Sequence, residues 1–246
     1  MMDFSFEAYG KLAKTVIENG YDFCCYHDYL NSKKPCILRH DVDFDLECAS
    51  IFAAFEQNIG DELGVGLNST YFVLLNTDFY NVFSGASRKL LCAIMESGQN
   101  IGLHFDETQY GDDPDLLRIP YHLEKELDVL SDIVGQKIDV VSMHRPSRRF
   151  LDADMKFPGV INSYSKTFFK EFKYVSDSRM NWREDVFGVV ESGEYGSINI
   201  LTHPIWYKEK QESHREIIST FLDGVKCRYD NLLNENIRDY KEFMEK

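Results

Sequence analysis

Short apolar runs, rich in β-branched and aromatic residues, alternate along this chain with longer segments of helical period. The runs that we predict to be strands cover residues 36–40, 69–75, 100–105, 139–143, 160–164, 174–177 and 197–202. Such alternation is typical of crossover units, in which each strand lies parallel to the next. The pattern therefore predicts an α/β fold, a distorted (β/α) barrel with about seven parallel strands.

The segments between these runs have helical period, and glycine follows most of them. Helices are predicted over residues 6–19, 45–58, 88–97 and 116–134. Glycine ends helices well because it adopts a left-handed backbone at no steric cost. Three of the helices are therefore expected to close at Gly20, Gly60 and Gly98. In the fourth, an apolar face indicates packing on a core, through Leu123, Leu127 and Leu130.

One domain is the expected organisation, because 246 residues suffice for one barrel and leave little room for a second domain. No stretch approaches the roughly 18–20 consecutive apolar residues that a membrane-spanning helix needs. The first residues, MMDFSFE, lack the basic start and the apolar core of a signal peptide. We therefore expect a soluble protein that is located in the cytoplasm.

Charge and cysteine content narrow the classes of partner. The formal net charge of −14 repels phosphate backbones and anionic lipid surfaces. It argues against nucleic acid or a membrane as the main partner, and it favours small or uncharged substrates. The six cysteines form no CxxC pair, and their mostly apolar neighbours indicate reduced thiols that are packed in a core.

The first cluster of ionisable residues is RHDVD at residues 39–43, where an apolar strand runs directly into a helix. Two carboxylates one residue apart at a strand end can project into one pocket, one binding a metal and the other acting as a base. The alternative is structural, because Asp43 or Asp45 would also serve to cap the following helix.

Three further strands end in histidine, at His104, His144 and His203. A single histidine in such a place is more often a core or surface residue than a ligand. Together with His40, however, strand ends take four of the seven histidines. In barrels of this kind the carboxyl ends of the strands meet at the active site, so we predict that these residues share one site.

Segments in this order resemble the motifs of the polysaccharide deacetylases of carbohydrate esterase family 4, in particular a branch whose first motif reads Arg-His-Asp-Val-Asp. The matching segments are RHDVD at 39–43, STYF at 69–72, GLH at 102–104, RP at 145–146, DSRMNW at 177–182 and LTH at 201–203. The similarity covers about residues 36–206. It implies one deacetylase-like domain over residues 1–246, with helical extensions at both ends.

The resemblance implies roles for the matching residues. Asp41 would act as the base and Asp43 as a metal ligand, the reverse order staying open, and His104 would be the firmest ligand. His203 would protonate the departing amine, and Arg145 would hold the base or a developing negative charge in place. The remaining predicted site residues are Asp177, in the catalytic group, and the substrate-binding residues Arg39, Trp182 and Trp206.

One position departs from the family pattern. The usual second ligand lies four residues after His104, where this chain has Thr108. We expect His144 to complete the site, because it immediately precedes the RP segment that resembles a motif of the same cleft. The alternatives are His40 and Asp106.

One carboxylate and two imidazoles leave open positions on a divalent metal for a water and a substrate carbonyl. Zinc is the first choice, and mixed oxygen and nitrogen ligands also suit iron, cobalt, nickel or manganese. The resemblance implies removal of the N-acetyl group from an amino sugar or sugar conjugate. The missing signal peptide implies an intracellular substrate, free or carried on a nucleotide or lipid, and surface-polysaccharide biosynthesis would suit both expectations.

Aromatic residues near the motifs are candidates for stacking on sugar faces, namely Tyr110, Trp182, Trp206 and Tyr207. Two other functions stay open. A hydrolase of another small amide or cyclic ureide would use the same metal chemistry in a narrower pocket. A non-catalytic sugar-binding relative would keep the barrel and lose the chemistry, and Thr108 favours it.

Overall fold

The structure is a computed structural model that describes residues 2–111 and 116–244. The chain divides into two compact units, Met1–Lys210 and Gln211–Lys246. The described part of the second unit carries two helices, α7 (His214–Asn236) and α8 (Tyr240–Met244), at the place of the predicted C-terminal extension. All predicted site residues belong to the first unit, and the single domain expected over residues 1–246 stays a prediction.

A sheet forms the centre of the first unit. Its strands are β1 (Asp22–Phe23), β2 (Pro35–Val42), β3 (Thr70–Leu74), β4 (Asn100–Phe105), β5 (Val140–Met143), β6 (Ile161–Asn162), β7 (Lys173–Ser176) and β8 (Ile198–Thr202). The order is β6-β5-β4-β3-β2-β8-β7, β1 pairs with the start of β2, and all pairs are parallel.

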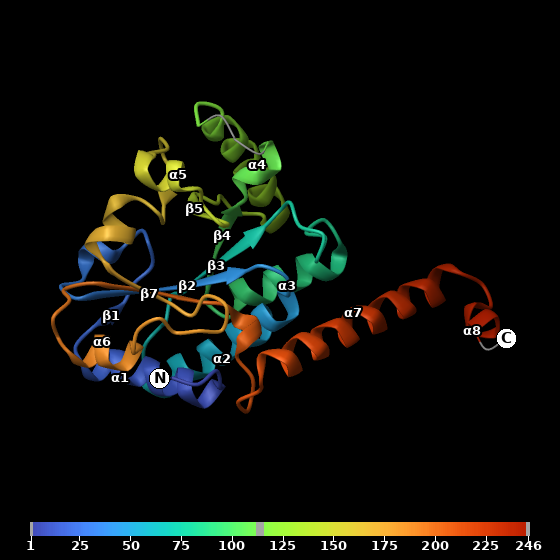
Figure 1. The fold of residues 1–246 in the computed structure, drawn as a ribbon, viewed down its shortest axis with the longest axis horizontal. Helices are drawn as coiled ribbons and strands as arrows, with labels where there is room; N and C mark the ends of the chain where they lie inside the picture. Colours follow the sequence, from blue (N-terminus) through green and yellow to red (C-terminus); the bar gives the residue numbers. More distant parts are fainter. Residues whose placement is uncertain (1, 112–115, 245–246) are drawn as a thin grey trace. The chain divides into compact units, whose positions relative to one another are not determined.

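The sheet curls as a barrel does (Figure 1). Within the described residues no ladder joins the two ends of the path, β6 and β7, so the barrel is not closed by backbone hydrogen bonds. The predicted α/β fold, a distorted (β/α) barrel with about seven parallel strands, is confirmed. The two-residue β1 was not predicted, because so short a run carries no periodicity of its own.

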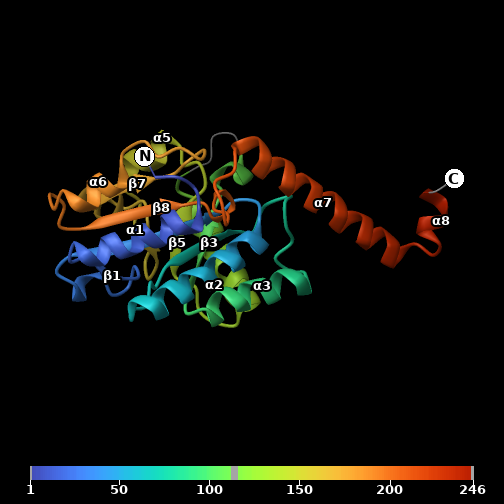
Figure 2. The ribbon, with the colours of Figure 1, turned by 90° about the horizontal axis from the view of Figure 1, so that it is seen from below.

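Helices cover the outside of this sheet. In the first unit they are α1 (Phe6–Glu18), α2 (Leu46–Leu63), α3 (Gly85–Glu96), α4 (Ile119–Val134), α5 (Arg148–Ala153) and α6 (Val186–Glu191). Helices α6, α1, α2, α3 and α4 contact one another in that order, and Figure 2 shows α1, α2 and α3 along one side of the strands. Shorter turns are η1 (Tyr29–Asn31), η2 (Glu107–Tyr110), η3 (Thr167–Glu171) and η4 (Pro204–Trp206).

Side-chain caps explain where several helices begin. Ser5, Asp45, Ser84 and Ser147 each precede a helix and accept hydrogen bonds of 2.9–3.1 Å from backbone N–H groups of its first turn. These bonds satisfy donors that the helix itself leaves unpaired. Asp45 is therefore the cap of α2, and Asp43 is not part of it.

Helix α2 is longer than predicted. It continues through Gly60 to Leu63, and the residue that ends it is Gly64, whose φ of 70° is left-handed. A Cβ on Gly60 would lie 2.6 Å from the carbonyl oxygen of Val65. The prediction that Gly60 closes this helix is therefore wrong. Glycine stands at position 60 because a larger side chain would be too close to the backbone of Val65.

The cysteines are all free, and their burial differs from the prediction. Cys24 and Cys36 are buried, but Cys92 and Cys227 are exposed. The expectation that these thiols pack in a core is therefore wrong for the exposed pair. None of the helices in the described residues is long and apolar enough to cross a membrane.

Candidate metal centre

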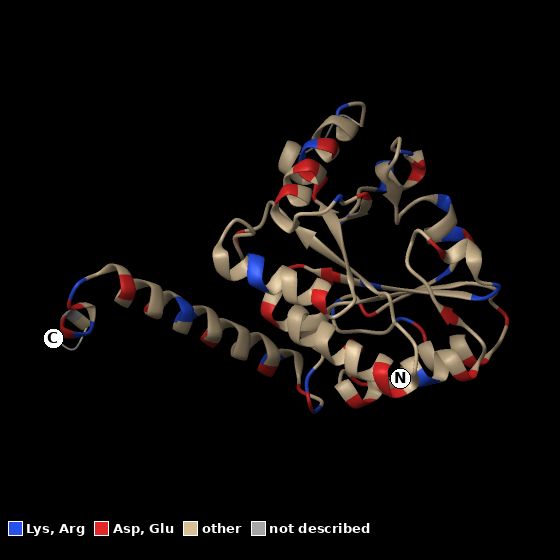
Figure 3. Ribbon diagram, turned by 180° about the vertical axis from the view of Figure 1, so that it is seen from behind, with Lys and Arg blue, Asp and Glu red and all other residues tan. Residues whose placement is uncertain are grey.

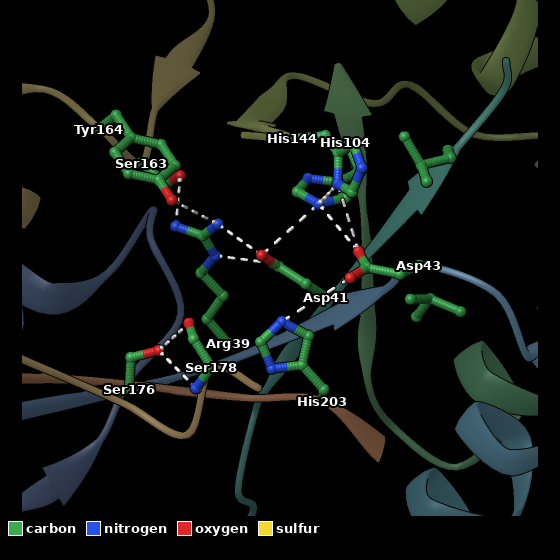
Figure 4. A network of polar contacts seen from close by, with 12 residues as sticks. Arg39, Asp41, Asp43, His104, His144, Ser163, Tyr164, Ser176, Ser178 and His203 are labelled. Carbon is green, nitrogen blue, oxygen red and sulfur yellow. Dashed lines mark hydrogen bonds and ion pairs between the residues drawn. The ribbon is translucent and has the colours of Figure 1, made fainter. Parts of the chain in front are cut away.

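The residues of the RHDVD segment divide between the two faces of the sheet, because alternate side chains of a strand point in opposite directions. Arg39, Asp41 and Asp43 lie on one side, where Figure 4 shows them with His104, His144 and His203. Every residue of β2 is buried. The charged side chains of this apolar strand, Arg39 and Asp41, are thus buried, and each needs a partner inside the protein.

His40 points to the opposite face and lies outside the site. Its side chain is 0% exposed; Nε2 lies 2.9 Å from Glu56 Oε1, and Nδ1 lies 2.6 Å from Thr202 Oγ1. Glu56, in α2, also accepts the hydroxyls of Tyr9 and Tyr71 at 2.6 and 2.8 Å. The prediction that all four strand-end histidines share one site is therefore wrong for His40, which joins β2 to α2 and β8.

The three predicted metal ligands come together from three strand ends. Asp43 follows β2, His104 lies in β4, and His144 follows β5. His104 Nε2 and His144 Nδ1 lie 3.3 and 3.4 Å from Asp43 Oδ1, and the two ring nitrogens lie 3.2 Å from each other. These donor atoms could hold one metal ion between them.

The spacing of these atoms fits a metal ion. With bonds of about 2.1 Å, ligand atoms at the corners of a tetrahedron lie about 3.4 Å apart. Asp43 Oδ1 is buried, and within the described residues no hydrogen bond satisfies it. A carboxylate and two imidazoles form a donor set that suits zinc and related divalent ions. The residues present therefore fit the group, and Asp43, His104 and His144 would hold it.

The protonation of Asp43 matches this role. Burial raises the pKa of its carboxyl, but the imidazoles of His104 and His144 outweigh burial and hold the pKa well below its ordinary value. The side chain of His104 is 2% exposed, that of His144 12% and that of Asp43 23%. A deprotonated carboxylate, which a metal requires, thus lies in a largely buried place that small molecules can still reach.

Asp41 lies beside these three residues, and Arg39 holds it. Arg39 donates from Nε to Asp41 Oδ1 and from Nη2 to Oδ2, both at 2.8 Å, and its side chain is 0% exposed. The guanidinium also donates to the Ser163 hydroxyl at 3.3 Å and lies 4.7 Å from the Tyr164 ring. Burial raises the pKa of Asp41, but Arg39 and then His104 lower it below its ordinary value. Asp41 is therefore an ionised carboxylate in a fixed orientation.

His203, after β8, is paired with Asp177, after β7. Its Nδ1 lies 2.6 Å from Asp177 Oδ1, and its backbone N–H donates to Oδ2 at 3.0 Å. Its Nε2 is directed to the metal centre, 3.9 Å from Asp43 Oδ2. Burial lowers the pKa of His203, but Asp177, more than any other group, raises it to about 9. His203 is therefore protonated at neutral pH.

These groups open into one cavity of about 590 Å³. The predicted site residues that line it are Asp41, Asp43, His104, His144, Arg145, His203 and Trp206. The other lining residues, which were not predicted as site residues, are Met143, Pro146, Tyr164, Ser178, Arg179, Arg183 and Leu201. Arg179 lies in the DSRMNW segment and Arg183 directly follows it, and Tyr164 is the last residue of a predicted strand. Their positions at the ends of strands could therefore have indicated that they line the site.

Three predicted site residues do not line the cavity. Asp177 lies behind His203, and Trp182 is buried at 2% exposure. Arg39 lies beneath Asp41, which corrects two expectations: Arg39 does not face a substrate, and the residue that holds Asp41 is Arg39 and not Arg145. Residues 39 and 41 share one face of a strand, and that spacing was a signal for the pair.

The other candidates lie elsewhere. Asp106 accepts the backbone N–H and the hydroxyl of Thr108, at 3.0 and 2.7 Å, and so caps the turn η2. Asp106 is not one of the residues that could hold the metal, and neither Asp106 nor Thr108 lines the cavity. Of the aromatic candidates for stacking, Tyr110 stacks on His122 with ring centroids 3.8 Å apart. Tyr207 is 1% exposed, so only Trp206 lines the cavity.

Sequence comparison assigns no family, because no family model and no curated protein matches the chain. Solved structures do match. The Xyl-CE4 domain of a xylanase from the hindgut metagenome of Trinervitermes trinervoides is 11% identical, with a TM-score of 0.44 over 80% of this chain and 85% of that one.

Two further structures are similar to the same degree. A CE4 family pseudoenzyme from Bacillus anthracis is 15% identical, with a TM-score of 0.44 over 80% of this chain and 62% of its own. A deacetylase from Streptococcus pyogenes is 11% identical, with a TM-score of 0.44 over 82% of each chain. At these identities, the chemistry of the site has to come from the chain's own residues.

Proposed function

We propose that this protein is a metal-dependent hydrolase that cleaves an amide bond, in particular the N-acetyl group of an amino sugar or sugar conjugate. The arrangement that carries the proposal is the pair of groups beside Asp43, His104 and His144. Asp41 is an ionised carboxylate, and His203 is a protonated imidazole. Both face the cavity that the three ligands line, so a general base and a general acid lie beside the candidate metal centre.

The residues around the cavity divide the reaction between them. A divalent metal held by Asp43, His104 and His144 would supply Lewis acidity toward a water and a substrate carbonyl. Asp41 accepts the proton of the water, because Arg39 keeps its carboxylate ionised and oriented. The water oxygen bonds to the acyl carbon, and Arg145, at the cavity wall, meets the negative charge that develops on the carbonyl oxygen.

His203 completes the reaction. Asp177 holds its Nδ1 and leaves Nε2 directed to the centre, so the proton passes from Nε2 to the departing nitrogen as the carbon–nitrogen bond breaks. The products are a free amine and a carboxylate. General acid and base catalysis of this kind contributes about 10²–10⁴-fold to a rate.

The size of the cavity supports a sugar over a narrower amide. Its volume of about 590 Å³ lies within the ~300–1,000 Å³ of small-molecule pockets, and Trp206, although only 6% exposed, is part of its wall. Zinc is the proposed metal, and surface-polysaccharide biosynthesis is the proposed process.

Metal analysis combined with product analysis tests the proposal. Zinc-loaded protein is expected to release acetate and free amine from N-acetylglucosamine and its oligomers, and chelation is expected to stop the release. Asp41→Asn should keep the bound metal and lose activity. If fully loaded protein releases no acetate from any N-acetylated sugar but binds one of them, the sugar-binding alternative replaces the proposal.

A further inference from the structure

The cavity carries uncompensated positive charge in a chain that is strongly acidic. The net charge is −14, and Asp and Glu are spread over the outer helices (Figure 3). Yet three arginines line the cavity, namely Arg145, Arg179 and Arg183. They come from two loops, one after β5 and one after β7. The charge of this wall is thus opposite to that of the chain as a whole.

These arginines have no carboxylate partner among the residues that the structure describes. Outside the cavity the ion pairs include Arg148 with Asp152 at 3.7 Å and Lys173 with Glu184 at 2.5 Å. Arg145, Arg179 and Arg183 form neither an ion pair nor a hydrogen bond within residues 2–111 and 116–244. All three side chains are exposed.

The carboxylates of the site already have binding partners of their own. Asp41 is bound at both oxygens by Arg39, and Asp177 is bound at both oxygens by His203. Asp43 stands between two imidazoles as a ligand. Asp41 and Asp177 therefore have positive partners of their own and Asp43 would have the metal ion, so the positive charge of the wall remains for a ligand.

The loops hold two of the arginines in an unfavourable backbone conformation. Arg145 has a φ of 51°, and Arg179 and Met180 have φ values of 63° and 53°. Non-glycine residues adopt this left-handed region only where the surrounding structure fixes them. Around Arg179 the turn is fixed by the backbone bond from Asn181 N–H to the Asp177 carbonyl, 3.1 Å long. The cost in free energy indicates that the placement of these side chains serves a ligand.

We infer that the substrate carries an anionic group, a phosphate or a carboxylate, that Arg179 and Arg183 bind while the acyl group lies at Asp43, His104 and His144. The inference rests on the proposed function and adds the class of substrate to it. Of the described residues that line the cavity, three are arginine and none is lysine. The planar guanidinium matches phosphate and carboxylate oxygens two at a time, whereas an ammonium offers a point charge.

An acylated amino sugar phosphate, a nucleotide-linked sugar or an acylated sugar acid satisfies this requirement, and a neutral polysaccharide does not. The positive wall also attracts such a substrate against the repulsion of the chain's net charge, because a cavity focuses the field of the charges that line it. Expressed as kcat/KM, the preference for anionic substrates should therefore weaken as salt is added.

Matched substrates test the inference. N-acetylglucosamine is compared with its 1-phosphate and 6-phosphate, and with N-acetylmuramic acid as the carboxylate arm, by acetate release from the metal-loaded protein. We expect kcat/KM to be at least ten times higher for one anionic arm. Arg179→Gln and Arg183→Gln should each lower that value about 10–100-fold and change the value for N-acetylglucosamine less than twofold. Arg88→Gln, on the exposed face of α3, is the control of equal charge.

Binding provides a readout without turnover. Inorganic phosphate and N-acetylglucosamine 1-phosphate are titrated calorimetrically into the same protein and into Arg179→Gln/Arg183→Gln. A loss of affinity of ~10-fold or more in the double variant supports the inference even if no acylated sugar is hydrolysed, in which case only the proposed function fails. Equal kcat/KM for neutral and anionic sugars, with unchanged phosphate affinity in the double variant, would overturn the inference and leave the proposed function standing.

Discussion

Arg39, Asp41 and Asp43 show how strand alternation assigns roles within one short segment. The three share one side of β2 and its end, whereas His40 between them points to Glu56. The sequence predicted Asp41 and Asp43 at one pocket because their spacing of two follows this period. The same period would have excluded His40 and paired Arg39 with Asp41. The convergence of His104 and His144 depends on strand order, which no local pattern specifies.

The first prediction concerns the ligand that the sequence made firmest. His104→Ala is expected to reduce bound metal from one ion per chain to near zero, because it removes one of three donors that lie 3.2–3.4 Å apart. Elemental analysis of purified protein measures this, and far-UV circular dichroism should show an unchanged fold. His27→Ala is the control, since His27 contacts Asp139 away from the cavity. Full occupancy in His104→Ala would remove this residue from the ligand set.

The second prediction separates positioning from metal binding. Asp177→Asn keeps the shape of the side chain but removes the charge that most strongly raises the pKa of His203. The rate should fall ~100-fold or more while metal content stays constant. Because the pKa of His203 falls, its protonated form is lost at lower pH, and the alkaline limb of the rate profile should shift to lower pH. A reduced rate with an unshifted limb would contradict the assignment of His203 as the acid.

The sequence predicted the presence of the helices better than the residues at which they end. Glycine after a helical run has two meanings: a left-handed C-cap, as at Gly64 with φ 70°, or close packing, as at Gly60. The sequence shows the glycine and not the neighbour that it must avoid. For that reason the end of α2 was placed too early, whereas caps such as Ser5 act within one turn and follow local rules.

The third prediction compares two glycines inside helices. Gly60→Ala should lower the free energy of unfolding by about 1–3 kcal/mol, because the new Cβ would lie 2.6 Å from the backbone oxygen of Val65. Gly10→Ala, in α1, should raise it by about 0.5–1 kcal/mol, because the nearest atom there is the Ile59 Cδ1 at an ordinary 3.7 Å. Urea unfolding measures both. A Gly60→Ala variant as stable as Gly10→Ala would show that the helix can shift.

The fourth prediction concerns the contact between α4 and its neighbours. Burial raises the pKa of Glu126 to about 7, although the Tyr110 hydroxyl and Asn76 Nδ2 donate hydrogen bonds that lower it. The folded protein therefore binds a proton that the unfolded chain, with a carboxyl pKa of about 4.5, has released. The stability due to this group is fully present below pH 4.5 and decreases as pH rises through 7.

Glu126→Gln removes that titration. The melting temperature of the variant relative to the unaltered protein should therefore increase between about pH 5 and pH 8, as differential scanning calorimetry would show. Glu124→Gln, at an exposed position of the same helix, is the matched control. A difference between Glu126→Gln and the unaltered protein that is the same at both pH values would show that Glu126 is ionised in the fold throughout.

At the scale of the whole first unit, the alternation of strands and helices predicted the class of fold and the parallel direction of the strands, but not their order, β6-β5-β4-β3-β2-β8-β7. The curl of the sheet did not follow, because closure depends on contacts between residues far apart in the chain. One such contact is the buried Arg39, on β2, with Ser163, which follows β6. The same side chain that orients Asp41 thus also joins parts of the sheet that no backbone ladder connects within the described residues.

The metal centre is a second long-range connection, and its effect on stability is the last prediction. Asp43, His104 and His144 extend from β2, β4 and β5, so one bound ion would link strands that are not all neighbours in the sheet. A ligand that binds only the folded state at 100 times its Kd raises the free energy of unfolding by about 2.7 kcal/mol, or roughly 5–10 °C in Tm for a chain of this size. Calorimetry of chelated and zinc-loaded protein measures the rise. Asp43→Asn should show little of it, because the amide brings no negative charge to the two imidazoles. An equal rise in Asp43→Asn would place the stabilising ion at another site.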